Sequence, residues 1–415
     1  MMHNQTPTQA RAGADLRRGW QSLDRTQLAL LALVLVRLAV ITLFLLNVLP
    51  LERRDEVYRW YLQHGGDQET LLALARSILA GAPISTSVSI GQALMMAPWV
   101  ALLRPAHYME IVAPLVLVNG YLFGGLSVLL VGDLARTATG DRRAALLAAG
   151  LWALLPLFAY FAFFWHFDPV LLRSVTVPKV GWLNGLSDGP AAFFLLLGSV
   201  LLARLQREVE PGFWQAAGVG AALGAAVLFR LTVAPAAAFL LLLVWIVAGW
   251  RAFLAALGAL LVVYLPQAWY NHAVFGFPFT TGYLSIDDVR DFGGTLRRPF
   301  GDILARFPAS PSLANIGGAV AHFVGRRPWI LAPLAAGAAV GLAALVSLWR
   351  RLGWRTVLLL VAAPLAYLLP MMMMSNFATD PIRYAMPAMP ALLVATCFVL
   401  VRMVHRWLPG GEPAG

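Results

Sequence analysis

Ten long apolar runs constrain this chain more than any other feature of its sequence. A helix that crosses a bilayer needs about 20 consecutive apolar residues. The runs are residues 27–49, 111–135, 143–165, 186–205, 213–229, 233–249, 252–270, 329–349, 354–374 and 385–403. Hydrophobic residues make up 60% of the chain and charged residues only 12%, with a mean hydropathy of +0.73, which excludes a soluble globular protein. We therefore expect an all-α polytopic membrane protein with about ten transmembrane helices.

An eleventh apolar run, residues 88–103, is shorter and contains Pro98. At about 1.5 Å per residue it falls short of a hydrocarbon core of about 30 Å. If it does not cross, the short basic loops all face one side, which the positive-inside rule makes cytoplasmic. These loops hold Arg11, Arg17, Arg18, Arg25, Arg136, Arg142, Arg143, Arg204, Arg207, Arg251, Arg350, Arg351, Arg355, Arg402 and Arg406. We expect a re-entrant or surface-lying helix here, and both termini in the cytoplasm.

The same topology defines the domain organisation. Residues 1–26 form a cytoplasmic tail, residues 27–405 a transmembrane domain, and residues 406–415 a second cytoplasmic tail. Extracytoplasmic loops are expected at about 50–110, 166–188, 270–328 and 375–384. The net charge of +11 is spread between the apolar runs, which is typical of topology determinants and anionic-lipid contacts rather than of nucleic-acid binding. The single cysteine, Cys397, excludes an intrachain disulfide.

The first long loop opens with Asp55 and Glu56, followed by Tyr58, just beyond the first span. Asp67 is a candidate N-cap for an amphipathic helix that ends near Gly81 and Pro83. Its apolar stripe consists of Leu71, Leu72, Ala75, Ile78 and Leu79, and such a helix can lie in the membrane interface with the stripe facing lipid. The acidic pair would then stand at the membrane boundary. The alternative is that the two acids are solvated and balanced by neighbouring arginines.

The second loop carries His166, Asp168, Lys179 and, at the mouth of the next span, Asp188. Asp188 could be the N-cap of that span or could project into a cavity. His166 and Asp168 have a spacing that is weak evidence for a metal site, and we predict no metal ligands.

Arg230 lies between two apolar runs, where a guanidinium is costly unless it meets an anion or a wet cavity. Arginine is well suited to binding phosphate, but Arg230 could also extend to the lipid head groups. Two Gly-x-x-x-Gly pairs, Gly120 with Gly124 and Gly220 with Gly224, predict close helix packing.

The order of these motifs resembles the GT-C superfamily of membrane glycosyltransferases, and among them bacterial relatives of protein mannosyltransferases and of the lipid A aminoarabinose transferase. The resemblance covers roughly residues 30–402. It rests on the acidic pair after the first span, on Asp188, and on the segments Asn271 to Tyr283 and Arg383 to Pro390. Many relatives also carry a soluble extracytoplasmic domain after the last span, whereas this sequence ends soon after its own.

The resemblance implies an inverting transfer of a sugar from a polyprenyl-phosphate donor to an unidentified lipid, glycan or protein acceptor, on the outer side of a bacterial inner membrane. It implies Asp55 as the base, with Glu56 and Asp188 as supporting acids. The implied phosphate partners are Arg230 and Arg383, with Lys179 as a weaker candidate, and some relatives use a divalent cation instead. The implied substrate-lining residues are Tyr58, His166, Asp168, Asn271, Tyr283 and Tyr384. The rival class is a lipid-linked-sugar flippase or another secondary transporter, which would carry ionisable groups at mid-membrane; only Arg37 lies clearly within a span.

Overall fold

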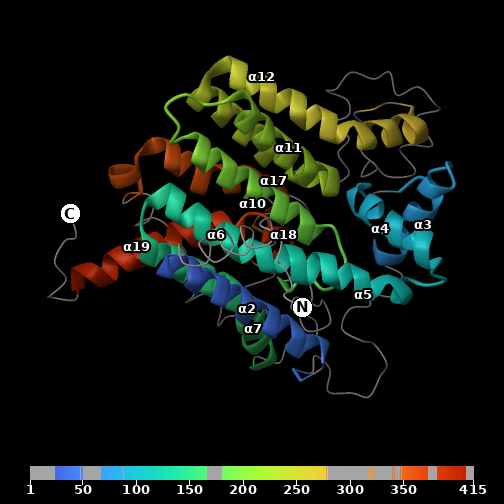
Figure 1. Ribbon diagram of the computed structural model, residues 1–415, viewed down its shortest axis with the longest axis horizontal. Helices are drawn as coiled ribbons and strands as arrows, with labels where there is room; N and C mark the ends of the chain where they lie inside the picture. The colour runs from blue at the N-terminus through green and yellow to red at the C-terminus, as the bar shows by residue number, and fades with distance from the viewer. Residues whose placement is uncertain are drawn as a thin grey trace, which may run out of the picture.

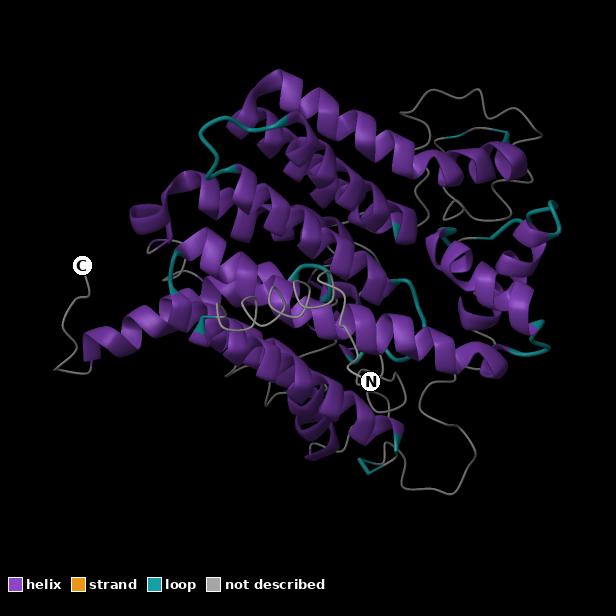
Figure 2. Ribbon diagram, viewed as in Figure 1, coloured by secondary structure: helices purple, strands orange, loops and turns teal. Residues whose placement is uncertain are grey.

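The computed structural model describes residues 24–46, 48–49, 67–86, 88–165, 180–276, 278, 348–372 and 381–407, with isolated positions between 317 and 346. Every regular element in this part of the chain is helical, as Figure 2 shows. The elements are α2 (Arg25–Leu45), α3 (Asp67–Leu79), α4 (Gly91–Leu103), η1 (Tyr108–Ile111), α5 (Val112–Leu115), η2 (Val116–Phe123), α6 (Gly124–Thr139), α7 (Arg142–Trp165), α10 (Asp188–Leu205), α11 (Phe213–Phe229), η3 (Leu231–Val233), α12 (Ala234–Phe275), η5 (Leu358–Ala362), α17 (Ala363–Met372), α18 (Pro381–Ala385) and α19 (Met389–Trp407). The prediction of an all-α membrane protein is confirmed.

Six helices in the described part are long and apolar enough to cross a membrane. They are Arg25–Leu45, Tyr108–Thr139, Arg142–Ala162, Asp188–Leu205, Leu231–Phe275 and Leu348–Met372. Gly91–Leu103, Phe213–Phe229 and Met389–His405 are shorter apolar helices. The first of these falls within the short run that was expected not to cross. The count of ten spans stays a prediction.

Two of these helices, Leu231–Phe275 and Leu348–Met372, are each interrupted by a glycine. Gly249 has φ of 81° and ψ of 177°, so α12 consists of two helical arms, residues 234–248 and 250–275. Gly353 has φ of 76°, a backbone conformation that glycine adopts without steric cost. Both glycines lie at junctions between apolar runs in the sequence, so each marks the point at which one predicted span ends and the next begins.

The helices form a bundle with two distinct ends. At one end, α3 and α4 lie together beside the end of α12 (Figure 1). At the other end, three ion pairs join helix termini: Asp24 with Arg142 at 3.6 Å, Asp133 with Arg204 at 2.5 Å, and Asp141 with Arg402 at 3.7 Å. Because the arginines of the predicted cytoplasmic loops gather at this second end, the arrangement agrees with the topology expected from their sequence positions.

Close packing of α11 against the second arm of α12 depends on the Gly220 and Gly224 pair. A Cβ atom at Gly220 would overlap the backbone carbonyl of Ala256, and one at Gly224 would lie 2.8 Å from the carbonyl oxygen of Leu260. The predicted packing role of this pair is therefore confirmed, since only glycine allows the two backbones to approach so closely.

Arg37, the charged residue within the first span, is a structural anchor. Its side chain is buried, and it donates hydrogen bonds to the backbone carbonyls of Val180, at 2.9 Å, and Trp152, at 3.5 Å. These bonds join α2 to α7 and to the loop before α10, which gives the buried charge a packing role rather than a place on a transport path.

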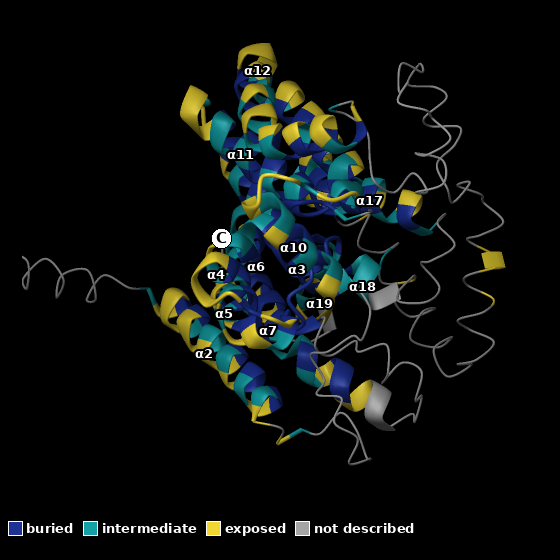
Figure 3. Ribbon diagram, turned by 90° about the vertical axis from the view of Figure 1, so that its right-hand side faces the viewer, coloured by how far each residue is buried: buried dark blue, intermediate teal, exposed yellow. Residues whose placement is uncertain are grey.

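The apolar stripe of α3 packs against protein, which corrects the expectation that it faces lipid. Leu71, Leu72 and Ala75 are each at most 1% exposed and share a core with Ala93 and Met96 of α4. Leu79, at the end of the stripe, is 49% exposed. Figure 3 shows that exposed positions lie along the outer flanks of helices such as α2 and α12. There, exposed side chains such as Leu35 and Val262 are apolar, as expected for surfaces that meet lipid.

Candidate active site

Asp188 is the centre of a buried cluster of charges at the end of the bundle that holds α3 and α4. It lies in the first turn of α10, where Ser187 is the N-cap and makes no side-chain capping bond. The Asp188 carboxylate instead forms ion pairs with Arg230 and Arg383, and its side chain is 4% exposed. The N-cap interpretation of Asp188 is therefore wrong, although the positive end of the helix dipole also favours a carboxylate here.

Arg230 follows α11 directly and is held by short-range and long-range contacts. Its Nε donates to Oγ1 of Thr232 at 2.9 Å, and its Nη1 pairs with Asp188. The next residue, Leu231, donates its backbone N–H to Oγ of Ser89 at 3.0 Å, which ties this turn to the segment before α4. The Arg230 side chain is only 5% exposed, so the alternative in which it extends to lipid head groups is wrong.

Arg383, on the short helix α18, joins two acids from distant parts of the chain. Its Nε lies 2.8 Å from Oδ2 of Asp188, and its Nη2 lies 2.7 Å from Oδ2 of Asp67. Burial by itself lowers the pKa of Arg383, but the carboxylates of Asp188 and Asp67 outweigh burial and raise the pKa well above its ordinary value. The guanidinium therefore stays charged at any physiological pH.

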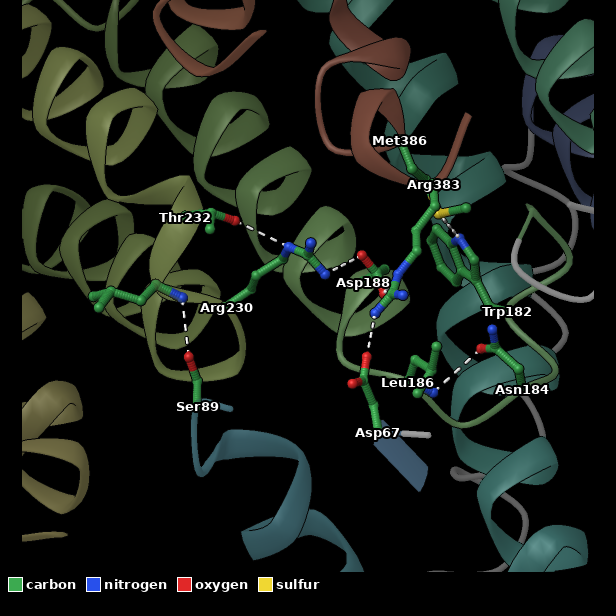
Figure 4. A network of polar contacts seen from close by, with 11 residues as sticks. Asp67, Ser89, Trp182, Asn184, Leu186, Asp188, Arg230, Thr232, Arg383 and Met386 are labelled. Carbon is green, nitrogen blue, oxygen red and sulfur yellow. Dashed lines mark hydrogen bonds and ion pairs between the residues drawn. The ribbon is translucent and has the colours of Figure 1, made fainter. Parts of the chain in front are cut away.

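Tyr384 lies beside both arginines. Its ring centroid is 5.3 Å from Cζ of Arg230 and 5.7 Å from Cζ of Arg383, within the range of cation–π contacts. Figure 4 shows Asp188 between the two guanidinium groups, with Asp67 beyond Arg383. Three predicted site residues and one predicted lining residue are thus brought together from α10, the end of α11 and α18.

Asp67 was predicted only as a helix cap, and its place in the cluster was missed. It is the first residue of α3 rather than the N-cap before it, and its carboxylate pairs with Arg383, which is 316 residues away. No local pattern could have indicated this contact, because a cap and an ion-pair partner look alike in sequence. Its side chain is 43% exposed, so it marks the open side of the cluster.

The loop before α10 holds the cluster in place through unusual backbone geometry. Trp182 has φ of 61° and Gly185 has φ of 67°, and a Cβ atom at Gly185 would overlap the hydroxyl of Tyr108. The carbonyl of Asn184 accepts hydrogen bonds from Gln68, at 2.5 Å, and from Tyr108, at 2.7 Å. These bonds join α3 and η1 to the loop that ends at Asp188, so Asp67 and Asp188 are positioned by a shared set of contacts.

Asn271 has described contacts with a different part of the structure. It is 1% exposed. Its Oδ1 accepts a hydrogen bond from Nε2 of Gln267 at 2.8 Å, and its Nδ2 donates to the carbonyl of Pro278 at 3.0 Å. Gln267 in turn accepts from the backbone N–H of Ile90 at 2.9 Å. Among the described residues, Asn271 thus braces the end of α12 against the segment before α4 rather than contacting the Asp188 cluster.

Seven predicted site residues lie outside the described residues: Asp55, Glu56, Tyr58, His166, Asp168, Lys179 and Tyr283. Within the described ranges, no group of three or more His, Cys, Asp or Glu side chains could hold a metal ion. The two carboxylates of the described cluster, Asp67 and Asp188, both pair with Arg383. With a guanidinium between them, these two groups do not fit a divalent cation.

The arrangement suits the recognition of a phosphate group. The guanidinium of Arg230 is buried and that of Arg383 is largely buried. Both are held by Asp188 and flanked by Tyr384, at the end of the bundle that holds α3 and α4. Guanidinium groups bind phosphate through paired N–H donors, and fixed cations stabilise negative charge that develops on a leaving group. Asp188 keeps both arginines in place before any anion arrives.

No family model matches the chain, and no curated protein matches its sequence. Its fold is similar to that of the oligosaccharyltransferase of Archaeoglobus fulgidus in the apo form, with a TM-score of 0.51 and 15% identity, over 94% of this chain and 52% of that one. A second structure, archaeal AglB from the same organism in complex with an inhibitory peptide and a dolichol-phosphate, aligns with a TM-score of 0.49 and 15% identity, over 92% of this chain and 52% of that one. This chain spans about half the length of the solved structures it matches.

The part of the chain that the structure describes is an all-helical, multi-pass membrane protein. Its fold is similar to that of the Archaeoglobus fulgidus oligosaccharyltransferase. At 15% identity the similarity establishes the fold, and the chemistry has to be argued from the site.

Proposed function

We propose that this protein is a membrane glycosyltransferase that moves a sugar from a polyprenyl-phosphate donor to an acceptor on the extracytoplasmic side of a bacterial inner membrane, with both termini in the cytoplasm. The observation that carries the proposal is the pairing of Arg230 and Arg383 on Asp188 at one end of the bundle. The basic loops gather at the other end, so this end corresponds to the extracytoplasmic side.

Arg230 and Arg383 would bind the donor phosphate. Two neighbouring cations buried in a membrane protein are costly unless anions accompany them. Asp188 and Asp67 supply that balance in the described structure, and the partly exposed Asp67 is the anion that a phosphate could most easily displace from Arg383. Lys179 is a further candidate for the phosphate and lies outside the described residues.

The proposed reaction is an inverting single displacement. Asp55, as the base, takes the proton of the acceptor hydroxyl while the oxygen attacks the anomeric carbon of the sugar. The bond from that carbon to the phosphate oxygen breaks, and polyprenyl phosphate leaves with the bonding electrons, its charge stabilised by Arg230 and Arg383. Glu56 orients the acceptor or the sugar. Asp188 acts through the two arginines and is a positioning residue.

Donor binding gives the first test. Arg230→Gln removes the charge from the phosphate site, whereas Arg230→Lys keeps it and serves as the matched control. We expect Arg230→Gln to weaken binding of a polyprenyl-phosphate sugar by tenfold or more, since a charge-assisted contact is typically worth about 1.5–3 kcal/mol. Arg230→Lys should recover most of that loss. Equal affinity in all three proteins would place the phosphate site elsewhere.

The base gives the second test. Asp55→Asn keeps the size of the side chain but cannot accept a proton at neutral pH, so we expect release of polyprenyl phosphate to fall by about 10² or more while donor binding stays near normal. Glu56→Gln should have a smaller effect. Glu110→Gln, an acid whose Oε2 accepts the backbone N–H of Ala106, is the control and should leave turnover unchanged. Full turnover in both Asp55→Asn and Glu56→Gln would reject Asp55 as the base. If the parent protein releases no polyprenyl phosphate but moves the lipid-linked sugar across the membrane, the transferase assignment falls and the flippase is favoured.

A further inference from the structure

A cavity of about 330 Å³ lies at the end of the bundle opposite to the Asp188 cluster. The end of α6, the end of α10 and the turn at Gly353 form its walls. Its lining residues are Thr137, Ala138, Thr139, Ala203, Gln206, Arg207, Arg351, Leu352, Arg355 and Thr356. Among the described lining residues three are arginines and none is acidic, so the charge of the cavity favours an anion over a cation.

The three arginines of the cavity are not neutralised by the acids around them. In the part of the chain that the structure describes, Arg207, Arg351 and Arg355 form no ion pair. The nearby carboxylate of Asp133 is bound by Arg204 at 2.5 Å. Arg207 follows the last turn of α10 and is favoured there by the helix dipole. That reason does not extend to Arg355, which begins the helical segment after Gly353, where a negative charge would be preferred.

Gln206 supplies a second and independent indication of a ligand. Gln206 lines the same cavity, and its amide nitrogen Nε2 is buried and has no hydrogen-bond partner among the described residues. A buried N–H donor without an acceptor is costly and is rare in native structures. An oxygen of an anion bound in the cavity would accept this N–H once the side chain turns toward the cavity.

We propose that this cavity binds a phosphate group through Arg207, Arg351, Arg355 and the amide of Gln206, and that the phosphate is the head-group phosphate of an anionic phospholipid in the cytoplasmic leaflet. The location supports a lipid source, since the cavity lies among the arginines of the basic loops, where anionic head groups gather. The site is separate from the proposed donor site, because none of its residues belongs to the Asp188 cluster.

The test uses the full-length protein, delipidated in a neutral detergent and titrated with phosphatidylglycerol, with phosphatidylcholine and with sodium phosphate. Native mass spectrometry counts the lipids retained at each concentration, and thermal unfolding reports binding of inorganic phosphate. The site variant is Arg351→Gln with Arg355→Gln. The matched control is Arg350→Gln with Arg251→Gln, which removes the same charge from exposed positions that do not line the cavity.

We expect the first phosphatidylglycerol to bind more tightly than phosphatidylcholine, and the site variant to weaken that binding by about 25-fold, or roughly fivefold for each arginine. The control variant should change it much less. Gln206→Leu alters no charge and should still weaken binding of the first phosphatidylglycerol by roughly threefold. Non-specific attraction to surface charge would not change with this substitution.

If inorganic phosphate binds, phosphatidylglycerol does not, and the same variants abolish phosphate binding, the cavity is a phosphate site but its ligand is a soluble phosphate and not a lipid. An equal loss in the site and control variants, or no effect of Gln206→Leu, would overturn the proposal, because binding would then reflect surface charge alone. Sugar transfer is not measured in any of these arms, so the outcome is independent of the proposed enzyme activity.

Discussion

Replacing Asp188 by Asn should destabilise the protein far more than the same change at Asp67, although both carboxylates contact Arg383. The Asp188 side chain is 4% exposed and its partner Arg230 is 5% exposed, whereas Asp67 is 43% exposed. Removing one partner of a buried ion pair typically costs about 3–5 kcal/mol, because the other charge is left buried without compensation. A partly exposed pair is worth about 1 kcal/mol or less. Arg383 keeps Asp67 in the Asp188 variant, so most of the cost arises at Arg230.

The measurement is unfolding by sodium dodecyl sulfate in mixed micelles, followed by tryptophan fluorescence, for Asp188→Asn, Asp67→Asn and the parent protein. We expect losses of unfolding free energy of about 3–5 and about 1 kcal/mol, respectively. The double variant Asp188→Asn with Arg230→Gln should lose less than the sum of the two single changes, because the two side chains interact directly and each single change already breaks their ion pair. Equal losses for the two single Asp variants, or strict additivity in the double variant, would refute the assignment of Asp188 as the buried partner of Arg230.

Three further predictions concern packing, the aromatic contact and topology. Gly220→Ala should cost about 1–3 kcal/mol of unfolding free energy by overpacking. Gly258→Ala, where an added Cβ meets nothing within 4 Å, is the control and should be neutral or stabilising. Equal effects of the two changes would disprove the close contact of α11 with α12. Tyr384→Phe should keep the unfolding midpoint, whereas Tyr384→Leu should lose about 1 kcal/mol, and no difference between them would argue against the cation–π contacts. In a cysteine-free background, a cysteine at Arg104 should react with an impermeant thiol reagent from outside and one at Arg136 only from inside; labelling of both from the same side would reject the topology.

Two of the sequence-based expectations about the site concern residues whose contacts depend on distant partners. Because its charge interrupts an apolar stretch, Arg230 was expected to meet an anion or a wet cavity, or else to extend to the lipid head groups. The structure places it against Asp188, 42 residues away. Asn271 was predicted to line the substrate site because it belongs to a motif, yet its described contacts brace the end of α12. A charge in an apolar run is energetically costly, and the sequence alone reveals that cost. An amide side chain can line a substrate site or brace a helix end, and no neighbouring residue in the sequence distinguishes the two roles.

The sequence by itself determined the class of fold and the apolar runs that form helices, because the cost of placing polar groups in lipid acts on each segment separately. Only the tertiary structure decided which charges meet. Asp67, Asp188 and Arg383 come from α3, α10 and α18, and the contacts of Arg383 span 195 and 316 residues. It also decided that the stripe of α3 faces α4 rather than lipid, since an apolar face is satisfied equally well by a protein core or by a membrane. Pairing of this kind depends on how whole helices pack, and no property of a single segment specifies it.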